Sequence, residues 1–307
     1  MRTWVLLILI FAGVAKAEDW HARVSDATAD VTDRVVELRH DFHANPELGN
    51  REFKTAKKIA RHLRSLGFDE VIEGVAHTGV VGILNGDKPG ATVALRADMD
   101  ALPVTEKTGL PFASKVTTIW RGTETGVMHA CGHDAHMAIL LGVAQVLAGM
   151  TDQIPGTVKF IFQPAEEGPP EGEEGGAALM IKEGVLEGEY APGAIFGLHV
   201  FPGPTGGIMY KPDGMMAAAD GLAITVKGVQ THGSMPWGGV DPITTSAQII
   251  NALQSIVSRQ IDISNAPAVV TIGSISGGNR GNIIPEEVHM TGTIRTLDMA
   301  MREDIHA

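Results

Sequence analysis

Short runs of almost uninterrupted apolar residues constrain the fold of this chain more than any other feature. They cover residues 80–84, 92–97, 157–162 and 194–200, and segments with helical signals lie among them. Strands that are apolar along their whole length belong to parallel sheets that helices cover on both faces. The pattern therefore predicts an α/β domain with a mainly parallel sheet. Polar residues that follow these strands are expected at one edge of the sheet, where ligands bind in such folds.

The pattern changes after residues 201–213, which are rich in Gly and Pro and are predicted to form a hinge. Later segments alternate apolar and polar residues, as half-buried strands do, around one long amphipathic helix. These are strands at 222–226, 268–275 and 288–296 and a helix at 241–261. The β-α-β-β order predicts a small α+β sandwich over residues 215–307, in addition to an α/β domain over residues 18–214.

The first 17 residues have the features of a secretory signal peptide. Arg2 provides the basic region, residues 4–14 the apolar region, and Ala15 and Ala17 a small-x-small cleavage site. The apolar region is shorter than the ~20 residues that a membrane span needs. We therefore predict a secreted or periplasmic protein with no stable membrane association after cleavage. An uncleaved N-terminal anchor is the alternative.

Charge and motifs exclude several classes of protein. The chain has 24 Lys and Arg against 36 Asp and Glu, a formal net charge of −12, and its basic residues form no patch. Nucleic-acid binding needs clustered cations, so we expect no nucleic-acid partner. The sequence also lacks the G-x-G-x-x-G, G-x-x-x-x-G-K and G-x-S-x-G fingerprints of dinucleotide, nucleoside triphosphate and serine-hydrolase sites.

The only cysteine of the chain lies among three histidines. Cys131 and His133 flank Gly132, just before an apolar helix-like run. Thiolate and imidazole are common ligands of zinc and similar divalent ions, and a turn can direct both at one ion. We therefore predict that Cys131 and His133 bind metal, with a buried structural thiol as the alternative for Cys131. His129 and His136 are further candidates, for which a hydrogen-bonded structural role is favoured.

Paired carboxylates follow the apolar strand at 157–163. Glu166 and Glu167 are adjacent, and neighbouring side chains on an extended segment point in different directions. One carboxylate would bind a metal ion while the other holds the attacking water, a division that suits metal-assisted hydrolysis. The alternative is a solvated acidic loop.

Two other strands end in residues that suit the same site. His199 ends the strand at 194–200 and is a third or fourth candidate ligand, unless it is a satisfied core histidine. Asp98 and Asp100 lie two residues apart, on one face of their strand, where they would support ligand histidines or cap a turn. In the second domain His232, Asn282 and Arg295 form a polar set that suits a substrate carboxylate and carbonyl.

Five blocks of the sequence resemble the M20 metallopeptidase family. The blocks are Leu95–Pro103, Met128–His136, Gln163–Gly168, Gly197–His199 and Asn282–Pro285. The likeness is strongest to the amidohydrolase branch, which includes hippurate hydrolases, N-acyl-amino-acid hydrolases and plant auxin-conjugate hydrolases. It implies a catalytic domain with an inserted lid or dimerisation domain. It also implies two divalent metal ions per subunit, Zn or Mn, with Co and Ni as further candidates.

The resemblance also implies roles for individual residues. Four match the family's metal-ligand positions: Cys131, His133, Glu167 and His199. Glu166 matches the general base, which takes a proton from the attacking water and later delivers it to the leaving amine. Asp100 matches the supporting acid behind a ligand. His232 matches a lid histidine that, in dimeric relatives, stabilises the oxyanion in the partner's site, so a homodimer through the lid is expected. Asn282 and Arg295 match substrate-binding positions.

The expected function is metal-dependent hydrolysis of N-acyl amino acids, such as hippurate, to a carboxylic acid and a free amino acid. A dipeptidase or exopeptidase of the same family is one alternative. The family places a last ligand histidine in a catalytic segment that resumes after the lid. This chain ends at Ala307, inside the predicted lid, and His306 lies in the wrong region. A non-catalytic fragment is therefore a further alternative, and we expect a longer protein.

Overall fold

The computed structural model describes residues 2–307 and, within the first helix, the side chains from residue 20 onward. The predicted signal peptide, residues 1–17, therefore lies outside the described side chains. Among the described residues, no helix is both long enough and apolar enough to cross a membrane. The chain divides into two compact units, the first ending at Pro202 and the second covering Gly203–Ala307. This division falls within the predicted hinge, residues 201–213, and therefore lies before the domain boundary that was expected after residue 214.

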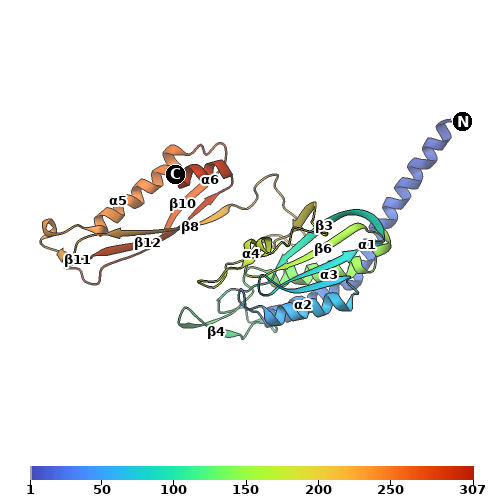
Figure 1. Cartoon of the computed structure of the whole chain (residues 1–307), viewed down its shortest axis with the longest axis horizontal. Coiled ribbons are helices and arrows are strands. Elements are labelled where there is room, and N and C mark those ends of the chain that lie inside the picture. Colours follow the sequence, from blue (N-terminus) through green and yellow to red (C-terminus); the bar gives the residue numbers. More distant parts are fainter. Residues whose placement is uncertain (1) are drawn as a thin grey trace. The chain divides into compact units, whose positions relative to one another are not determined.

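Within residues 2–202, the main sheet has the strand order β1-β2-β6-β3-β7. Its strands are β1 (Glu70–Val75), β2 (Gly79–Asn85), β3 (Lys88–Asp98), β6 (Pro155–Gln163) and β7 (Ala194–Gly197). β3 pairs in parallel with both β6 and β7, whereas β2 runs antiparallel between β1 and β6. In this described sheet only β2 therefore points the opposite way, which confirms an α/β fold with a mainly parallel sheet (Figure 1).

Helices cover both faces of this sheet (Figure 1). They are α1 (Arg2–Ala44), α2 (Phe53–Ser65), α3 (His133–Ala148) and α4 (Gly176–Lys182), with a 3-10 turn η1 (Thr151–Gln153). Alternate residues of β6 point to opposite faces. Phe160 and Phe162 pack with buried residues of α1, α2 and α3, whereas Ile161 packs with Leu179 and Met180 of α4. The continuous apolar run of β6 is thus explained by burial on both sides.

Strand register aligns the ends of β3, β6 and β7. Asp98 pairs with Gln163 of β6, and Arg96 pairs with Gly197 of β7 on the other side of β3. The segments that follow these strands therefore leave the sheet at one edge, beside the first turn of α3. A small hairpin, β4 (Thr117–Trp120) and β5 (Thr123–Gly126), lies in the connection from β3 to α3.

The second unit is built on an antiparallel sheet with the order β10-β12-β8. Its elements are β8 (Ala218–Lys227), β9 (Thr231–His232), η2 (Pro236–Gly238), α5 (Pro242–Ser255), the π-helical turn η3 (Ile256–Gln260), β10 (Ala268–Ser276), β11 (Ile283–Ile284), β12 (Glu287–Thr296) and α6 (Met299–His306). α5 begins after Asp241, whose carboxylate accepts the N–H groups of Ile243 and Thr244, a standard N-cap. The predicted β-α-β-β order is confirmed.

Candidate active site

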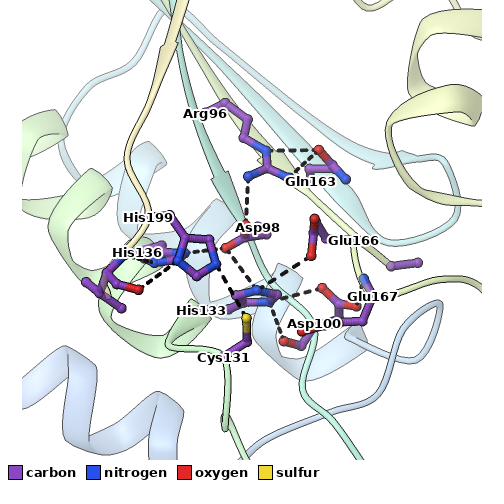
Figure 2. A network of polar contacts seen from close by, with 12 residues as sticks. Arg96, Asp98, Asp100, Cys131, His133, His136, Gln163, Glu166, Glu167 and His199 are labelled. Atoms are coloured by element: carbon purple, nitrogen blue, oxygen red, sulfur yellow. Dashed lines mark hydrogen bonds and ion pairs between the residues drawn. The ribbon is translucent and has the colours of Figure 1, made fainter. Parts of the chain in front are cut away.

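The turn before α3 brings Cys131 and His199 together. The Sγ atom of Cys131 lies 3.4 Å from Nε2 of His199 (Figure 2). Gly132, between Cys131 and His133, has φ +93°, a conformation that L-residues with side chains rarely adopt. A Cβ atom on Gly132 would lie 2.2 Å from Cγ2 of Val200, so only glycine fits between these residues. His199 is fixed from the other side, because its Nδ1 donates to the carbonyl oxygen of Val200 at 2.7 Å.

His133 is held in one tautomer by the backbone of the β3 edge. Its Nδ1 donates to the carbonyl oxygen of Asp100 at 2.8 Å, and a carbonyl oxygen can only accept. Nε2 is therefore unprotonated in the neutral ring. That atom is fully buried and has no hydrogen-bond partner among the described residues. It faces Oδ1 of Asp98 at 3.7 Å and Oε2 of Glu166 at 3.8 Å, too far for a hydrogen bond.

Glu166 and Glu167 lie on a turn, which corrects the prediction that they occupy an extended segment with divergent side chains. Ala165 has φ +47°, and the N–H of Gly168 donates to the carbonyl oxygen of Ala165 at 3.3 Å. The turn brings both carboxylates to the same ring: an oxygen of each lies within 4.8 Å of a nitrogen of His133. The N–H of Glu167 donates to Oδ2 of Asp100 at 3.0 Å, so Asp100 supports this turn as well as His133.

His136 is fully hydrogen-bonded, which agrees with the structural role favoured for it. Its Nδ1 lies 2.6 Å from Oδ1 of Asp98, and its Nε2 accepts the N–H of Val200 at 2.9 Å. Sequence analysis missed the residues that hold Asp98 in place. Nη1 of Arg96 donates to Oδ2 of Asp98 at 2.7 Å, and the same guanidinium donates to Oε1 of Gln163. The spacing of Arg96 and Asp98 on one strand face was the available signal.

Negative charge is in excess at this cluster. Burial would raise the pKa of Asp98, but the hydrogen bond with His136 and the charge of Arg96 lower it to about 2. Burial, with the nearby charge of Asp98, raises the pKa of Glu166. Burial and the adjacent Glu167 raise the pKa of Cys131 to about 12. A bound cation reverses this balance, because its charge favours thiolate and carboxylate together.

The residues present fit a two-ion metal site. Three candidate ligand groups share His133: one adds Cys131 and His199, one adds Glu166 and Glu167, and one adds Asp98 and His136. In the third group Asp98 and His136 already hydrogen-bond to each other, so the first two groups are the better candidates for two ions. The buried, unpartnered Nε2 of His133 at their junction needs a Lewis acid or a donor to be satisfied. The mixture of thiol, imidazole and carboxylate suits zinc and other borderline divalent ions. Cys131, His133, Glu167 and His199 stay the predicted ligands, and Glu166 the predicted base.

His129 does not have the hydrogen bonds that its favoured structural role requires. It is buried, and neither ring nitrogen has a partner within the described part of the chain. Burial lowers the pKa of its ring to about 4, so the imidazole is neutral. The structure does not place His129 in any group of candidate ligands among the described residues.

The second unit brings two of its three predicted residues together. β9 pairs with β11 so that His232 lies opposite Ile283, next to Asn282. The carbonyl oxygen of Asn282 accepts the N–H of Gly233 at 2.8 Å, which closes this pair of strands. Nδ1 of His232 lies 2.8 Å from Oγ of Ser234. Arg295 is exposed on β12, and no hydrogen bond joins it to either residue in the described structure. The trio therefore stays a prediction.

Comparison with known proteins agrees with this geometry. Residues 94–304 match the model of peptidase family M20/M25/M40. Thermostable carboxypeptidase 2 of Saccharolobus solfataricus is 45% identical over 283 residues, which cover 91% of this chain and 68% of that protein. Hippurate hydrolase of Campylobacter jejuni is 42% identical over 275 residues, covering 89% and 67%. A solved structure from Bacillus subtilis, described as a dinuclear metal binding peptidase from the M20 family, superposes with a TM-score of 0.69 and 37% identity, covering 89% of this chain and 66% of that one.

The fold and the cluster together define a metal-dependent hydrolase of amide bonds. The chain belongs to peptidase family M20/M25/M40. It spans about two thirds of the length of the relatives named above. The binding of two metal ions, predicted from the resemblance, agrees with both the clustered ligands and the dinuclear relative.

Proposed function

We propose that this protein hydrolyses N-acyl amino acids to a carboxylic acid and a free amino acid. The observation that carries the proposal is the buried Nε2 of His133, which lies between a thiol–imidazole pair and a pair of carboxylates. These thiol, imidazole and carboxylate groups suit metal ions that activate water for attack on an amide carbon. The likeness to hippurate hydrolase at 42% identity supports this choice of substrate class.

Glu166 is proposed as the general base. When bound, the ions would supply Lewis acidity, which polarises the amide carbonyl and lowers the pKa of water so that it is readily deprotonated for attack. The carboxylate of Glu166 accepts the water proton and passes it to the leaving amine nitrogen. Burial and the charge of Asp98 raise the pKa of Glu166, which improves a carboxylate for both steps at neutral pH. The backbone carbonyl of Asp100 keeps Nε2 of His133 unprotonated by accepting a hydrogen bond from Nδ1–H.

The second unit is proposed to supply substrate contacts. His232 would stabilise the developing oxyanion in a partner subunit, and Asn282 and Arg295 would bind the substrate carboxylate and carbonyl. The family resemblance supports these roles, and the exposure of His232 and Arg295 leaves both side chains accessible. A homodimer through the second unit follows from this role of His232. Export to the periplasm or the medium is proposed from the signal-like residues 1–17.

A second candidate is cleavage of peptides at the C-terminus. It is favoured by the 45% identity to thermostable carboxypeptidase 2. The same cluster would serve both reactions, since an acyl-amino-acid bond and a C-terminal peptide bond differ only in the acyl group. The substrate panel below separates the two.

The test measures free amino acid released from N-benzoylglycine, N-acetyl amino acids and dipeptides. The purified chain is assayed with manganese or zinc and again after chelation. Turnover of acyl amino acids that stops on chelation supports the proposal, and preference for dipeptides supports the second candidate. A folded chain that binds two metal ions and cleaves neither class would favour the third alternative, a non-catalytic fragment.

A further inference from the structure

Glu52 is a buried carboxylate that lies outside the metal cluster but contacts the turn that carries it. Glu52 precedes α2 and its relative exposure is 0%. Oε1 accepts the N–H of Ala165 at 2.9 Å, and Oε2 accepts the hydroxyl of Thr78 at 2.5 Å. Both oxygens of the buried group are therefore partnered, across 113 and 26 residues of chain.

The residue that Glu52 holds determines the direction of Glu166 and Glu167. Ala165 is the residue before this pair, and its φ of +47° turns the chain at the end of β6. An alanine in this region is strained by about 1 kcal/mol, so the surrounding contacts must fix it. Two carboxylates do so on either side of Glu166: Glu52 accepts the N–H of Ala165, and Asp100 accepts the N–H of Glu167.

We propose that Glu52 is a positioning residue, which fixes the turn 165–168 so that the carboxylates of Glu166 and Glu167 face His133 (Figure 2). The inference rests on the proposed function, because it assigns to Glu52 the geometry of the proposed base and of a proposed metal ligand. Glu52 itself touches neither residue's carboxylate through a hydrogen bond in the described structure.

The chemistry of the group supports a positioning role. Burial raises the pKa of Glu52 to about 7, although hydrogen bonds from Thr78 and the Ala165 N–H oppose the shift. A buried acid whose ionised form is disfavoured adds little to the free energy of unfolding. Apolar residues can often replace buried charged residues without loss of protein stability. An oxygen at this position is needed instead for the amide of Ala165, which would otherwise be a buried donor without an acceptor.

A matched contact elsewhere in the same unit separates positioning from general stabilisation. Oε2 of Glu183 accepts the N–H of Ala76 at 2.7 Å, and Ala76 has φ +48°. The donor, the acceptor type and the backbone conformation are the same as at Ala165. The turn at Ala76 joins β1 to β2 and carries no residue of the candidate metal cluster.

The experiment compares Glu52→Ala, Glu52→Gln and Glu183→Ala with the unaltered chain. Affinity for manganese and zinc is measured by titration, melting temperature is measured in chelator, and kcat and KM are measured for N-benzoylglycine. Glu52→Ala is expected to weaken metal binding by about 10- to 100-fold, the usual loss for a partner behind a ligand. Glu52→Gln keeps an oxygen for the Ala165 amide and is expected to retain most of the affinity. Glu183→Ala is expected to lower the melting temperature and leave metal affinity unchanged.

Equal metal affinity in Glu52→Ala and the unaltered chain would overturn the positioning role, and so would an equal loss in Glu183→Ala. If Glu52→Ala does not fold, Thr78→Val replaces it. That variant removes the partner of Oε2 with little change of shape, and the role requires it to bind metal more weakly than Glu183→Ala. An unaltered chain that binds no metal contradicts the proposed function instead, so the two failures are distinguishable.

Discussion

The Nδ1 atom of His133 donates to the backbone carbonyl oxygen of Asp100 at 2.8 Å. This contact decides which ring nitrogen is available to a metal ion, since the lone pair of Nε2 is then directed at the candidate cluster. The carbonyl belongs to the backbone that follows β3, so side-chain substitution at position 100 does not remove it. The orientation of this ligand is therefore set mainly by the main chain.

Replacing Glu166 by Gln should stop turnover without releasing metal. The amide cannot accept the proton of water, and loss of a general base costs about 10²- to 10⁴-fold in rate. The measurements are hydrolysis of N-benzoylglycine and metal content per chain. Glu171→Gln is the control, because Glu171 is an exposed acid of the same acidic segment. Undiminished turnover in Glu166→Gln would remove Glu166 from the role of base.

Replacing Cys131 by Ser should change which metal is preferred. The thiolate is a soft ligand and selects zinc over manganese, whereas a serine hydroxyl does not. We expect zinc affinity to fall by more than the ~10- to 100-fold that loss of an outer partner costs, and manganese affinity to fall less. Competitive titration of the two ions gives the ratio. An unchanged ratio would show that Sγ of Cys131 does not bind the ion.

Replacing Gly132 by Ala should damage the metal site itself. The new Cβ atom would lie 2.2 Å from Val200, whose N–H donates to His136, so the segment with His199 has to move. Gly67→Ala is the matched control, since Gly67 has φ +79° and no atom within 4 Å of the added Cβ. In both variants the left-handed backbone of the new alanine lowers the free energy of unfolding by about 1–2 kcal/mol. Only Gly132→Ala is expected to lose metal affinity, and a similar loss in both would contradict the steric argument.

Stability should depend on pH through Glu52. Its pKa is about 7 in the folded chain against an ordinary value of 4.5, mainly because of burial. Between these values the folded chain keeps a proton that the unfolded chain has lost, so unfolding releases it. The free energy of unfolding therefore falls as pH rises from about 4.5 to about 7, by on the order of 3 kcal/mol.

Glu52→Gln cannot titrate, so its unfolding free energy should lack this fall. Denaturant unfolding of both chains in chelator, at several pH values across the window, measures the difference. Parallel pH profiles for the two chains would show that Glu52 ionises with an ordinary pKa.

The sequence predicted the strands that contain an apolar run. β2 and β6 are buried over most of their length, β3 is buried mainly toward its end, and their α/β arrangement is confirmed. The apolar run of β7 predicted a strand as well, but its residues are exposed. β1 was missed because it is mostly exposed and carries Glu70 and Glu73, which hide its pairing with β2. β9 and β11 each have only two residues, too few for a periodic signal.

The candidate site was predicted where it depends on strand ends and missed where it depends on tertiary contacts. Asp98, Asp100 and His199 follow apolar strands, and the structure brings all of them to one edge. The turn at Ala165 was not predicted, since alanine gives no signal for a positive φ. Glu52 was not predicted either, because its partner lies 113 residues away and only the folded chain joins them.

Two histidines in the first turn of α3 contact the end of β3 and the backbone that follows it. Asp98 contacts His136, and the carbonyl of Asp100 contacts His133, so a two-residue step on the strand meets a three-residue step on the helix. A slip of one residue in β3 would turn both acids to the opposite side of the sheet. Ion binding would then stabilise only chains whose sheet has the correct register. The metal would therefore favour correct folding as well as take part in catalysis.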